Sequence, residues 1–297
     1  MNLSLAYDIL RRWGNGGSLT PPGCCLTYVE HPLPRLRQRM CVQVGTIMEH
    51  RYAFWLWLRV KNELQSNCRL GGRISDHDFH PPDLLTLDWH NDVGGECDFT
   101  PSDLARLNQR DETEVGLFCW AGLRSLNDGH IAPAMWLNAI GNTYVVCKEP
   151  EDFEDCNRVF SDRYGREHTI TYLRSPADFC NLWRRSDQGD GLLWDIDLDY
   201  FTEAEEVPDQ MYTPMLSDRA IAEALDLQQE WLQILTANLR GITIALEPEY
   251  TGGLTNSLHL FRQWEKAFFE PPLFDKNCAW KSTISDQDSS IRVRGNH

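Results

Sequence analysis

The sequence predicts an α/β fold, a three-layer αβα sandwich with a mainly parallel central sheet. Two observations lead to this prediction. Short apolar segments with the composition of strands alternate along the chain with segments of helix-forming composition. Several strand-like segments are also apolar almost throughout, as expected of strands that helices cover on both faces of a sheet.

The predicted elements follow one another in a regular order. Strands are predicted at 41–50, 84–88, 142–149, 191–201 and 242–253. Helices are predicted at 51–65, 132–141, 217–241 and 254–269, while the segment 114–122 fits either type. The helix at 217–241 has the clearest boundaries, with Ser217 or Asp218 as its N-cap and Gly241 just past its end.

Length and composition indicate one large domain after a short arm. Residues 1–23 contain Gly-Asn-Gly-Gly and Pro-Pro-Gly, and we interpret them as an N-terminal arm or linker. Residues 24–297 would form a single domain. A hydrophobic content of 42% and eleven tryptophans allow that domain a substantial core.

The charge balance argues against one class of partner. The chain has 28 basic and 44 acidic residues, a net charge of −16, whereas a general nucleic-acid binder needs a basic surface. An acidic chain is compatible with a cationic substrate, with bound metal cations, or simply with solubility. We therefore expect no nucleic-acid partner.

Cysteine usage and the apolar segments predict a cytoplasmic protein. The ten cysteines are scattered, which favours reduced thiols over a disulfide framework. The N-terminal residues lack the apolar run and small-residue cleavage site of a signal peptide. The most apolar stretch, which begins at Tyr52, is too short to span a bilayer, so we expect no membrane partner.

Acidic or histidine side chains stand at the ends of four predicted strands, where ligands bind to parallel sheets. These residues are Glu49, His50, Asp88, His90, Asp92, Asp195, Asp197, Asp199, Glu247 and Glu249. Residues two apart in a strand point the same way, so the Asp-x-His-x-Asp and Asp-x-Asp-x-Asp runs can each converge.

Such a convergence predicts bound metal. Several carboxylates in one crevice repel one another unless a cation lies among them. Carboxylates with imidazoles suit a hard or borderline divalent ion such as manganese, and this number of carboxylates is natural for two ions. A single Asp-x-Asp at a strand end is more often a helix cap or a turn, but two clusters after apolar strands favour the metal site.

These motifs resemble a known family. "DWHND" resembles the D-x-H-x-D motif of the arginase, or ureohydrolase, superfamily, and "DIDLDYF" resembles its second motif. The order "EH", "LDWHND", "DIDLDYF" and "PEYTGG" is most similar to a branch that includes the peptide arginases, which modify ribosomally made precursor peptides. The resemblance runs from about Ile47 to Gly253 and implies that 24–297 is an arginase-like catalytic domain.

The resemblance implies two Mn²⁺ ions and names their ligands. Asp88, His90 and Asp92 would bind manganese, with Asp88 bridging the two ions. Asp197 and Asp199 match the second motif, with Asp197 bridging. The family's Gly-Gly-Asp-His-Ser segment and the Asp-Pro after its second motif are missing here, and both absences point away from free arginine as the substrate.

Two ligand assignments have alternatives. The run Asp195-Asp197-Asp199 allows a register shifted by two residues; in the preferred register Asp195 would support a ligand instead of binding metal. The family also has a histidine at the end of the preceding strand, followed by a helix. His50 fits that pattern better than His31, whose following prolines make a poorer helix start.

The resemblance also suggests catalytic residues. Arginases carry a histidine after the first motif that shuttles protons, and His130 is the candidate by order along the chain, although it could equally be an ordinary loop histidine. Arginases pair the guanidinium with a glutamate near the end of a late strand. Glu249 or Glu247 could do this, and the "PEYTGG" match favours Glu249.

The implied activity is manganese-dependent hydrolysis of the guanidino group of arginine residues in a peptide, giving ornithine residues and urea. One alternative is a small guanidine or amidine such as arginine or agmatine. An acyl-lysine deacetylase would need one zinc and fewer carboxylates. A third reading is a non-catalytic binding module with a structural metal or none. The sequence does not predict the oligomeric state.

Overall fold

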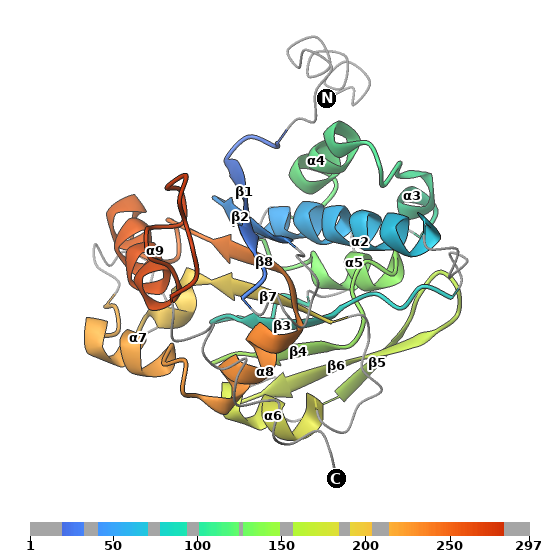
Figure 1. Ribbon diagram of the computed structural model, residues 1–297. Helices are drawn as coiled ribbons and strands as arrows, with labels where there is room; N and C mark the ends of the chain where they lie inside the picture. The colour runs from blue at the N-terminus through green and yellow to red at the C-terminus, as the bar shows by residue number, and fades with distance from the viewer. Residues whose placement is uncertain are drawn as a thin grey trace.

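The computed structural model describes residues 20–32, 41–70, 78–93, 101–124, 127–148, 157–183, 191–203 and 214–281. Within these ranges the chain forms an eight-stranded sheet with helices on both faces, as Figure 1 shows. The predicted α/β sandwich is therefore confirmed. Most of the predicted N-terminal arm lies outside the described residues, and the division at residue 23 stays a prediction.

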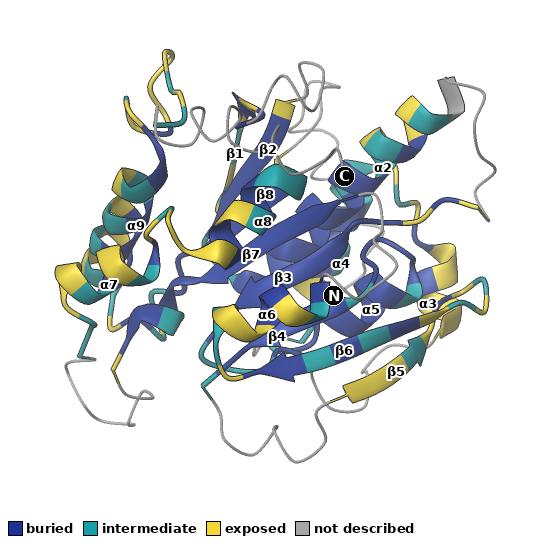
Figure 2. Ribbon diagram, turned by 60° about the horizontal axis from the view of Figure 1, so that its bottom comes forward, coloured by how far each residue is buried: buried dark blue, intermediate teal, exposed yellow. Residues whose placement is uncertain are grey.

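The strands lie in the order β1-β2-β8-β7-β3-β4-β6-β5. The inner strands run parallel to one another: β2 (Cys41–Ile47), β8 (Leu239–Ala245), β7 (Leu192–Asp197), β3 (Asp83–Leu87), β4 (Thr143–Val146) and β6 (Glu167–Leu173). The edges are closed by two antiparallel strands, β1 (Cys24–Glu30) and β5 (Asn157–Ser161). Figure 2 shows the buried inner strands and the exposed edge at β5.

Helices form a layer on each face of the sheet (Figure 1). One layer contains η1 (His50–Tyr52), α2 (Ala53–Leu70), α3 (Pro101–Arg106), α4 (Glu112–Ala121) and α5 (Ile131–Trp136). The other contains α6 (Pro176–Trp183), α7 (Asp218–Ala224), α8 (Glu230–Asn238) and α9 (Leu254–Phe268), and η3 (Leu198–Phe201) follows β7. Each layer buries its own hydrophobic cluster against the sheet.

The alternation of side chains along β7 determines the face of the sheet toward which Asp195 and Asp197 point. Leu192, Trp194 and Ile196 belong to the cluster under α8 and α9. Leu193 belongs to the cluster under α2. Because side chains alternate between the two faces of a strand, Asp195 and Asp197 point toward the α2 layer. That layer begins with η1, which carries His50.

The predicted helix at 217–241 is wrong as one element. Ser217 caps α7 as predicted, with its hydroxyl accepting a hydrogen bond from the Ala220 N–H at 3.2 Å. The helix then ends, because Asp226 forms a turn in which its carboxylate accepts from Gln228 N–H and its carbonyl from Gln229 N–H. A second helix, α8, starts at Glu230.

Gly241 lies inside strand β8 and does not end a helix. A Cβ atom at this position would lie 3.0 Å from side-chain atoms of both Leu193 and Val60. The glycine therefore allows α2 to pack closely over the junction of β7 and β8. The segment left ambiguous at 114–122 is helical in α4, with Asp111 as the N-cap for Thr113 and Glu114.

The strand order places a topological switch point between β3 and β7. From β3 the chain continues to its neighbour β4 on one side, whereas from β7 it continues to β8 on the other. Asp197 pairs with Ala245, which in turn pairs with Ile47, so these strands end in one row. Ligands of open parallel sheets bind beyond such ends, at the switch point.

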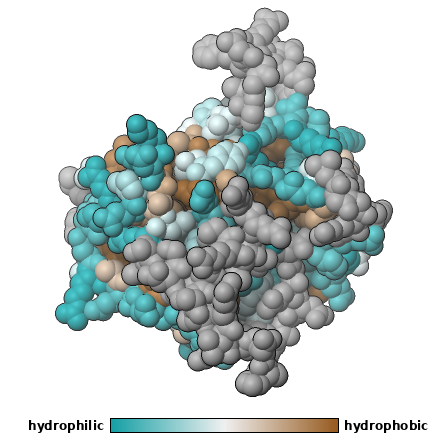
Figure 3. All heavy atoms as spheres, in the orientation of Figure 1, coloured by the Kyte–Doolittle hydropathy of each residue, from teal (hydrophilic) through white to brown (hydrophobic). Residues whose placement is uncertain are grey.

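The face of the molecule that Figure 3 shows has a polar region. Hydrophilic residues gather over α7 and α9 in the view of Figure 3. Helix α9 is amphipathic, with Leu260, Trp264 and Phe268 buried beneath it. Within the described ranges, no helix combines the length and the apolar character that crossing a membrane requires.

Candidate metal centre

The carboxyl ends of four neighbouring strands supply the candidate site. His50 opens η1 after β2, and Asp88 follows directly after β3. Asp197 is the last residue of β7, and Glu247 lies two residues beyond β8. All four side chains are buried. The strand-end rule that selected them from the sequence therefore brings them together in space.

A first group of possible metal ligands consists of His50 at its centre with Asp88, Asp92 and Asp197 around it. This group, together with a second one formed by Asp88, His90 and Asp199, is called the cluster below. Its Nδ1 atom lies 2.6 Å from Oδ2 of Asp92 and 3.2 Å from Oδ2 atoms of both Asp88 and Asp197. Burial disfavours the charged imidazole, yet the negative charges of Asp195 and Asp92 raise the pKa of His50 well above its usual range. The Nδ1 atom of His50 therefore faces three carboxylate oxygens.

Asp195 holds the other side of the same ring. Its Oδ2 atom lies 2.7 Å from His50 Nε2 and accepts a hydrogen bond from the Thr86 hydroxyl at 2.8 Å. Asp195 pairs with Thr86 and Thr243 in the middle of the sheet, one pleat short of the strand end. Burial raises its pKa, but the positive charge and hydrogen bond of His50 outweigh that effect and lower it. Asp195 therefore fixes the orientation of the His50 ring.

The second ligand group shares Asp88 with the first. His90 Nδ1 lies 3.2 Å from Asp199 Oδ2 and 3.7 Å from Asp88 Oδ1. Asp88 Oδ1 also accepts from the His90 N–H, and Asp199 Oδ1 accepts from the Trp89 N–H at 3.0 Å. The side chain of His90 is 30% exposed, whereas those of Asp88 and Asp199 are buried. This group therefore lies on the solvent side of the cluster.

The residues present fit divalent cations. Three buried atoms that face the cluster lie close to charged neighbours but form no hydrogen bond of good geometry with them: His50 Nδ1, Asp88 Oδ2 and Asp199 Oδ2. Burial and the charge of Asp88 raise the pKa of Asp92 well above its usual range, and burial and the charge of Asp199 do the same for Asp197. Cations would remove this repulsion, and imidazole with carboxylate is a donor set for manganese, iron or zinc.

His130 lies beside the first group. Its Nδ1 atom is 3.0 Å from the carbonyl oxygen of Asn127, which can only accept, so Nδ1 carries the proton. Its Nε2 atom is buried without a hydrogen-bond partner. Burial and then the charge of His50 lower the pKa of His130 to about 3, so the ring is neutral at pH 7. His130 also forms a third possible ligand group with His50 and Asp92.

Glu247 and Glu249 occupy different surroundings. Glu247 is buried, and its carboxylate accepts a hydrogen bond from the His50 N–H. Its two oxygens also accept from Asn127 Nδ2, at 2.8 and 3.1 Å. Burial raises the pKa of Glu247 to about 7. Glu249 is exposed and belongs to none of the ligand groups found among the described residues. The structure thus brings Glu247 to the cluster, although the sequence motif favoured Glu249.

Several residues at the site have a left-handed backbone. The φ angles of Asp92, Asn127 and Glu247 are 50°, 63° and 39°. Such values are uncommon outside glycine and are tolerated where the surrounding structure fixes them. Here each of the three carries a side chain that faces the cluster or its neighbours.

His31, the alternative to His50, lies near the amino end of β2, at the opposite end of the parallel strands from His50. Strand β1 is antiparallel to β2, and Glu30 pairs with Cys41 at the beginning of β2. His31 follows Glu30 and is buried there. The structure therefore brings His50, and not His31, to the ligand groups.

Sequence reasoning missed two residues of this site, Asn127 and Lys148. Asn127 lies in a loop with no periodic signal. Lys148 lies two residues beyond β4, where the strand-end rule applies, but the predicted pattern of metal ligands contains only acids and histidines. Burial lowers the pKa of Lys148 to about 8, while the charge of Asp199 opposes that shift.

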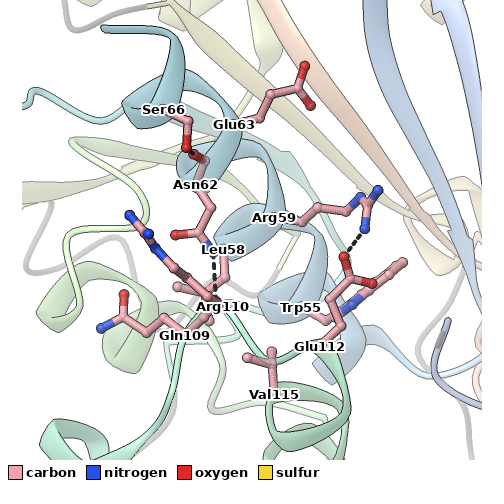
Figure 4. Close-up of a pocket in the computed structure, with 10 residues that line it drawn as sticks. All are labelled: Trp55, Leu58, Arg59, Asn62, Glu63, Ser66, Gln109, Arg110, Glu112 and Val115. Atoms are coloured by element: carbon pink, nitrogen blue, oxygen red, sulfur yellow. Dashed lines mark hydrogen bonds and ion pairs between the residues drawn. The ribbon is translucent and has the colours of Figure 1, made fainter. Parts of the chain in front are cut away.

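A separate hollow of about 420 Å³ lies on the outer side of α2. Figure 4 shows that its polar groups face one another: Arg59 pairs with Glu112, and Asn62 Nδ2 donates to the carbonyl oxygen of Gln109 at 2.6 Å. None of the clustered residues lines it. The hollow is therefore distinct from the candidate metal centre.

Comparisons with known proteins add a distant likeness. No family model and no curated protein sequence matches the chain. Among solved structures, proclavaminate amidino hydrolase from Streptomyces clavuligerus is similar with 12% identity and a TM-score of 0.38. The match covers 75% of this chain and 63% of that one, less than two thirds of its length. A TM-score of this size establishes neither a shared fold nor a shared activity.

Proposed function

We propose that the chain is a metal-dependent hydrolase that cleaves the guanidino group of arginine residues in a peptide, giving ornithine residues and urea. One observation carries the proposal. Two imidazole–carboxylate groups share Asp88, and the buried carboxylate of Glu247 lies directly beside them. The first feature suits hydrolysis by two cations, and the second suits a cationic substrate.

The ligand groups divide between two ions. His50, Asp88, Asp92 and Asp197 would hold the first ion, and Asp88, His90 and Asp199 the second. Bound divalent ions supply Lewis acidity, which lowers the pKa of water at the site to near neutrality. We propose manganese as the metal, because hard carboxylates with imidazoles suit it.

Glu247 would orient the guanidinium. Its carboxylate is fixed by Asn127 Nδ2 and the His50 N–H, so it has little freedom to move when a substrate binds. A charge-assisted pair with the guanidinium would favour the ionised form of Glu247, whose pKa burial otherwise raises to about 7. The guanidino carbon is thereby held toward the cluster.

His130 would carry the proton. Because Nδ1 donates to the Asn127 carbonyl, the lone pair lies on Nε2, which is buried without a partner. Nε2 can accept a proton from the attacking water and deliver it to the leaving side-chain amine. The bond between the guanidino carbon and that amine breaks, and urea departs with the added oxygen.

The partial solvent exposure of the second ligand group supports a peptide substrate. His90 is partly exposed, and its ring contacts the partly exposed ring of Tyr250 edge-on, with 5.6 Å between the ring centroids. The net charge of −16 also suits a cationic peptide. A small guanidine such as arginine or agmatine is the alternative that the same groups would serve.

An assay with matched substrates tests the proposal. The full-length protein is incubated with Mn²⁺ and either arginine-containing peptides or free arginine and agmatine. We expect urea, together with the loss of CH₂N₂ from one arginine of a peptide. Urea from small guanidines alone would contradict the peptide substrate, and no urea from metal-loaded protein would contradict guanidino hydrolysis.

Asp88→Asn is the control for this assay. Loss of turnover in a variant that stays folded is expected of a catalytic centre. A non-catalytic binding module would instead show a change in stability, with no urea from the wild type.

A further inference from the structure

Lys148 connects the two loops that carry the second ligand group. It follows β4, next to β3 in the sheet. Its backbone N–H donates to the carbonyl oxygen of Trp89 at 3.1 Å, and the Trp89 N–H donates to Asp199 Oδ1 at 3.0 Å. A continuous path of hydrogen bonds therefore runs from Lys148 to a ligand through the residue that separates Asp88 from His90.

The side chain of Lys148 makes a second connection to the same loops. Nζ donates to the carbonyl oxygen of Thr202 at 2.8 Å, and both the N–H and the hydroxyl of Thr202 donate to the Asp199 carbonyl at 2.8 Å. Nζ also lies 4.7 Å from the ring centroid of Trp89 and 4.9 Å from that of Tyr200. Each ring belongs to a residue adjacent to a ligand.

These contacts place a half-buried cation between the loop after β3 and the loop after β7. Cation–π contacts of this kind strengthen when they are shielded from water. The ammonium group also lies near the negative charge of Asp199. Removing it would release both aromatic rings and leave the Thr202 carbonyl without this donor.

We infer that Lys148 is a positioning residue for the second ion: it fixes His90 and Asp199 relative to Asp88 without binding metal itself. The inference rests on the proposed two-metal function and adds to it a residue that touches no reacting atom. Partners that orient metal ligands typically contribute 10- to 100-fold to affinity, so the expected effect is about that size.

The test is a Mn²⁺ titration of the metal-free full-length protein, with calorimetry for affinity and EPR for magnetic coupling between neighbouring ions. In Lys148→Met we expect second-ion affinity to fall by about 10- to 100-fold and the coupled signal to weaken, with first-ion affinity changed less than about 3-fold. Lys148→Arg should restore second-ion affinity to within about 3-fold, because a guanidinium also stacks on aromatic rings. Lys266→Met, on the exposed side of α9, is the control.

Lys148→Gln serves if the methionine variant fails to fold, because it keeps a donor for Thr202 but has no charge. Equal second-ion affinity in the wild type and in a folded Met or Gln variant would overturn the inference, as would a wild type that binds fewer than two ions. Two ions without urea release would instead reject the proposed function, and the comparison of variants would still decide the role of Lys148.

Discussion

His50 and Asp195 form a buried pair in which Nε2 of the imidazole lies 2.7 Å from Oδ2 of the carboxylate. A carboxylate in this position accepts the Nε2 proton and leaves Nδ1 for the cluster. Nδ1 lies within 3.2 Å of oxygens from Asp88, Asp92 and Asp197. The pair therefore determines which ring nitrogen faces the carboxylates of the cluster.

Replacing Asp195 should weaken the binding of the first ion. In Asp195→Asn the amide no longer stabilises His50 by charge, and we expect the affinity for Mn²⁺ to fall by about 10- to 100-fold. Calorimetric titration checks this. Asp162→Asn is the matched control, because Asp162 is also buried and pairs with Arg166 at the other edge of the sheet. Unchanged affinity in the Asp195 variant would show that the pair is only structural.

The two glutamates of "LEPEY" should behave differently. Glu247→Gln removes the buried carboxylate that we propose binds the guanidinium, and we expect kcat/KM to fall by about 100-fold or more. Glu249→Gln changes an exposed residue and should leave kcat/KM within about 3-fold of the wild type. Steady-state urea release measures both. The opposite result would assign substrate binding to Glu249, as the sequence motif suggested.

His130 should affect turnover without affecting metal content. His130→Asn removes the unpartnered Nε2 lone pair, and we expect kcat to fall by about 100- to 10,000-fold while two ions remain bound. Metal analysis after gel filtration accompanies the kinetics. His80→Asn, on the exposed surface, is the control. Loss of one ion in the His130 variant would identify it as a ligand with His50 and Asp92.

We expect Asp83, which lies away from the candidate metal centre, to make the free energy of unfolding depend on pH. It is buried at the start of β3, and burial raises its pKa from 3.8 to about 7, despite a hydrogen bond from the Asn142 N–H. At pH values between 3.8 and about 7, Asp83 keeps its proton in the folded state but has released it in the unfolded state. This contribution to stability is complete below pH 3.8 and is lost as the pH rises through about 7.

Asp83→Asn isolates that effect. Relative to this variant, the wild type should lose up to about 1.4 kcal/mol of unfolding free energy per pH unit between pH 4 and 7 and little beyond. Urea unfolding of the metal-free proteins at several pH values measures the difference. A constant difference across this range would contradict the raised pKa.

The position of a residue could be predicted from the sequence where the pattern of a single strand determines it. Asp88, Asp197 and Asp199 were identified because apolar strands end in acids, and parallel strands present those ends together. For the Asp195-Asp197-Asp199 run the family pattern favours the later pair, but the residues alone allow both registers, because all three share one period. Only pairing with Thr86 and Thr243 places Asp195 in the body of the sheet.

The sequence did not predict local structure or contacts that depend on segments distant along the chain. The segment 239–241 follows helix-like residues, but pairing with β7 and β2 makes it a strand. Likewise, Lys148 gains its contacts only because β4 lies beside β3, which no local pattern reveals. The metal ligands themselves stay predictions, because their assignment depends on ions that bind among them.

The most direct test of the central claim is a crystal structure of the protein grown with Mn²⁺, with anomalous scattering measured to locate the metal. The account predicts two anomalous peaks at the carboxyl ends of β3 and β7. One should be bonded to Nδ1 of His50 and the other to Nδ1 of His90, with Asp88 contacting both. A crystal grown with Mn²⁺ that shows no anomalous peak among these side chains would contradict the account.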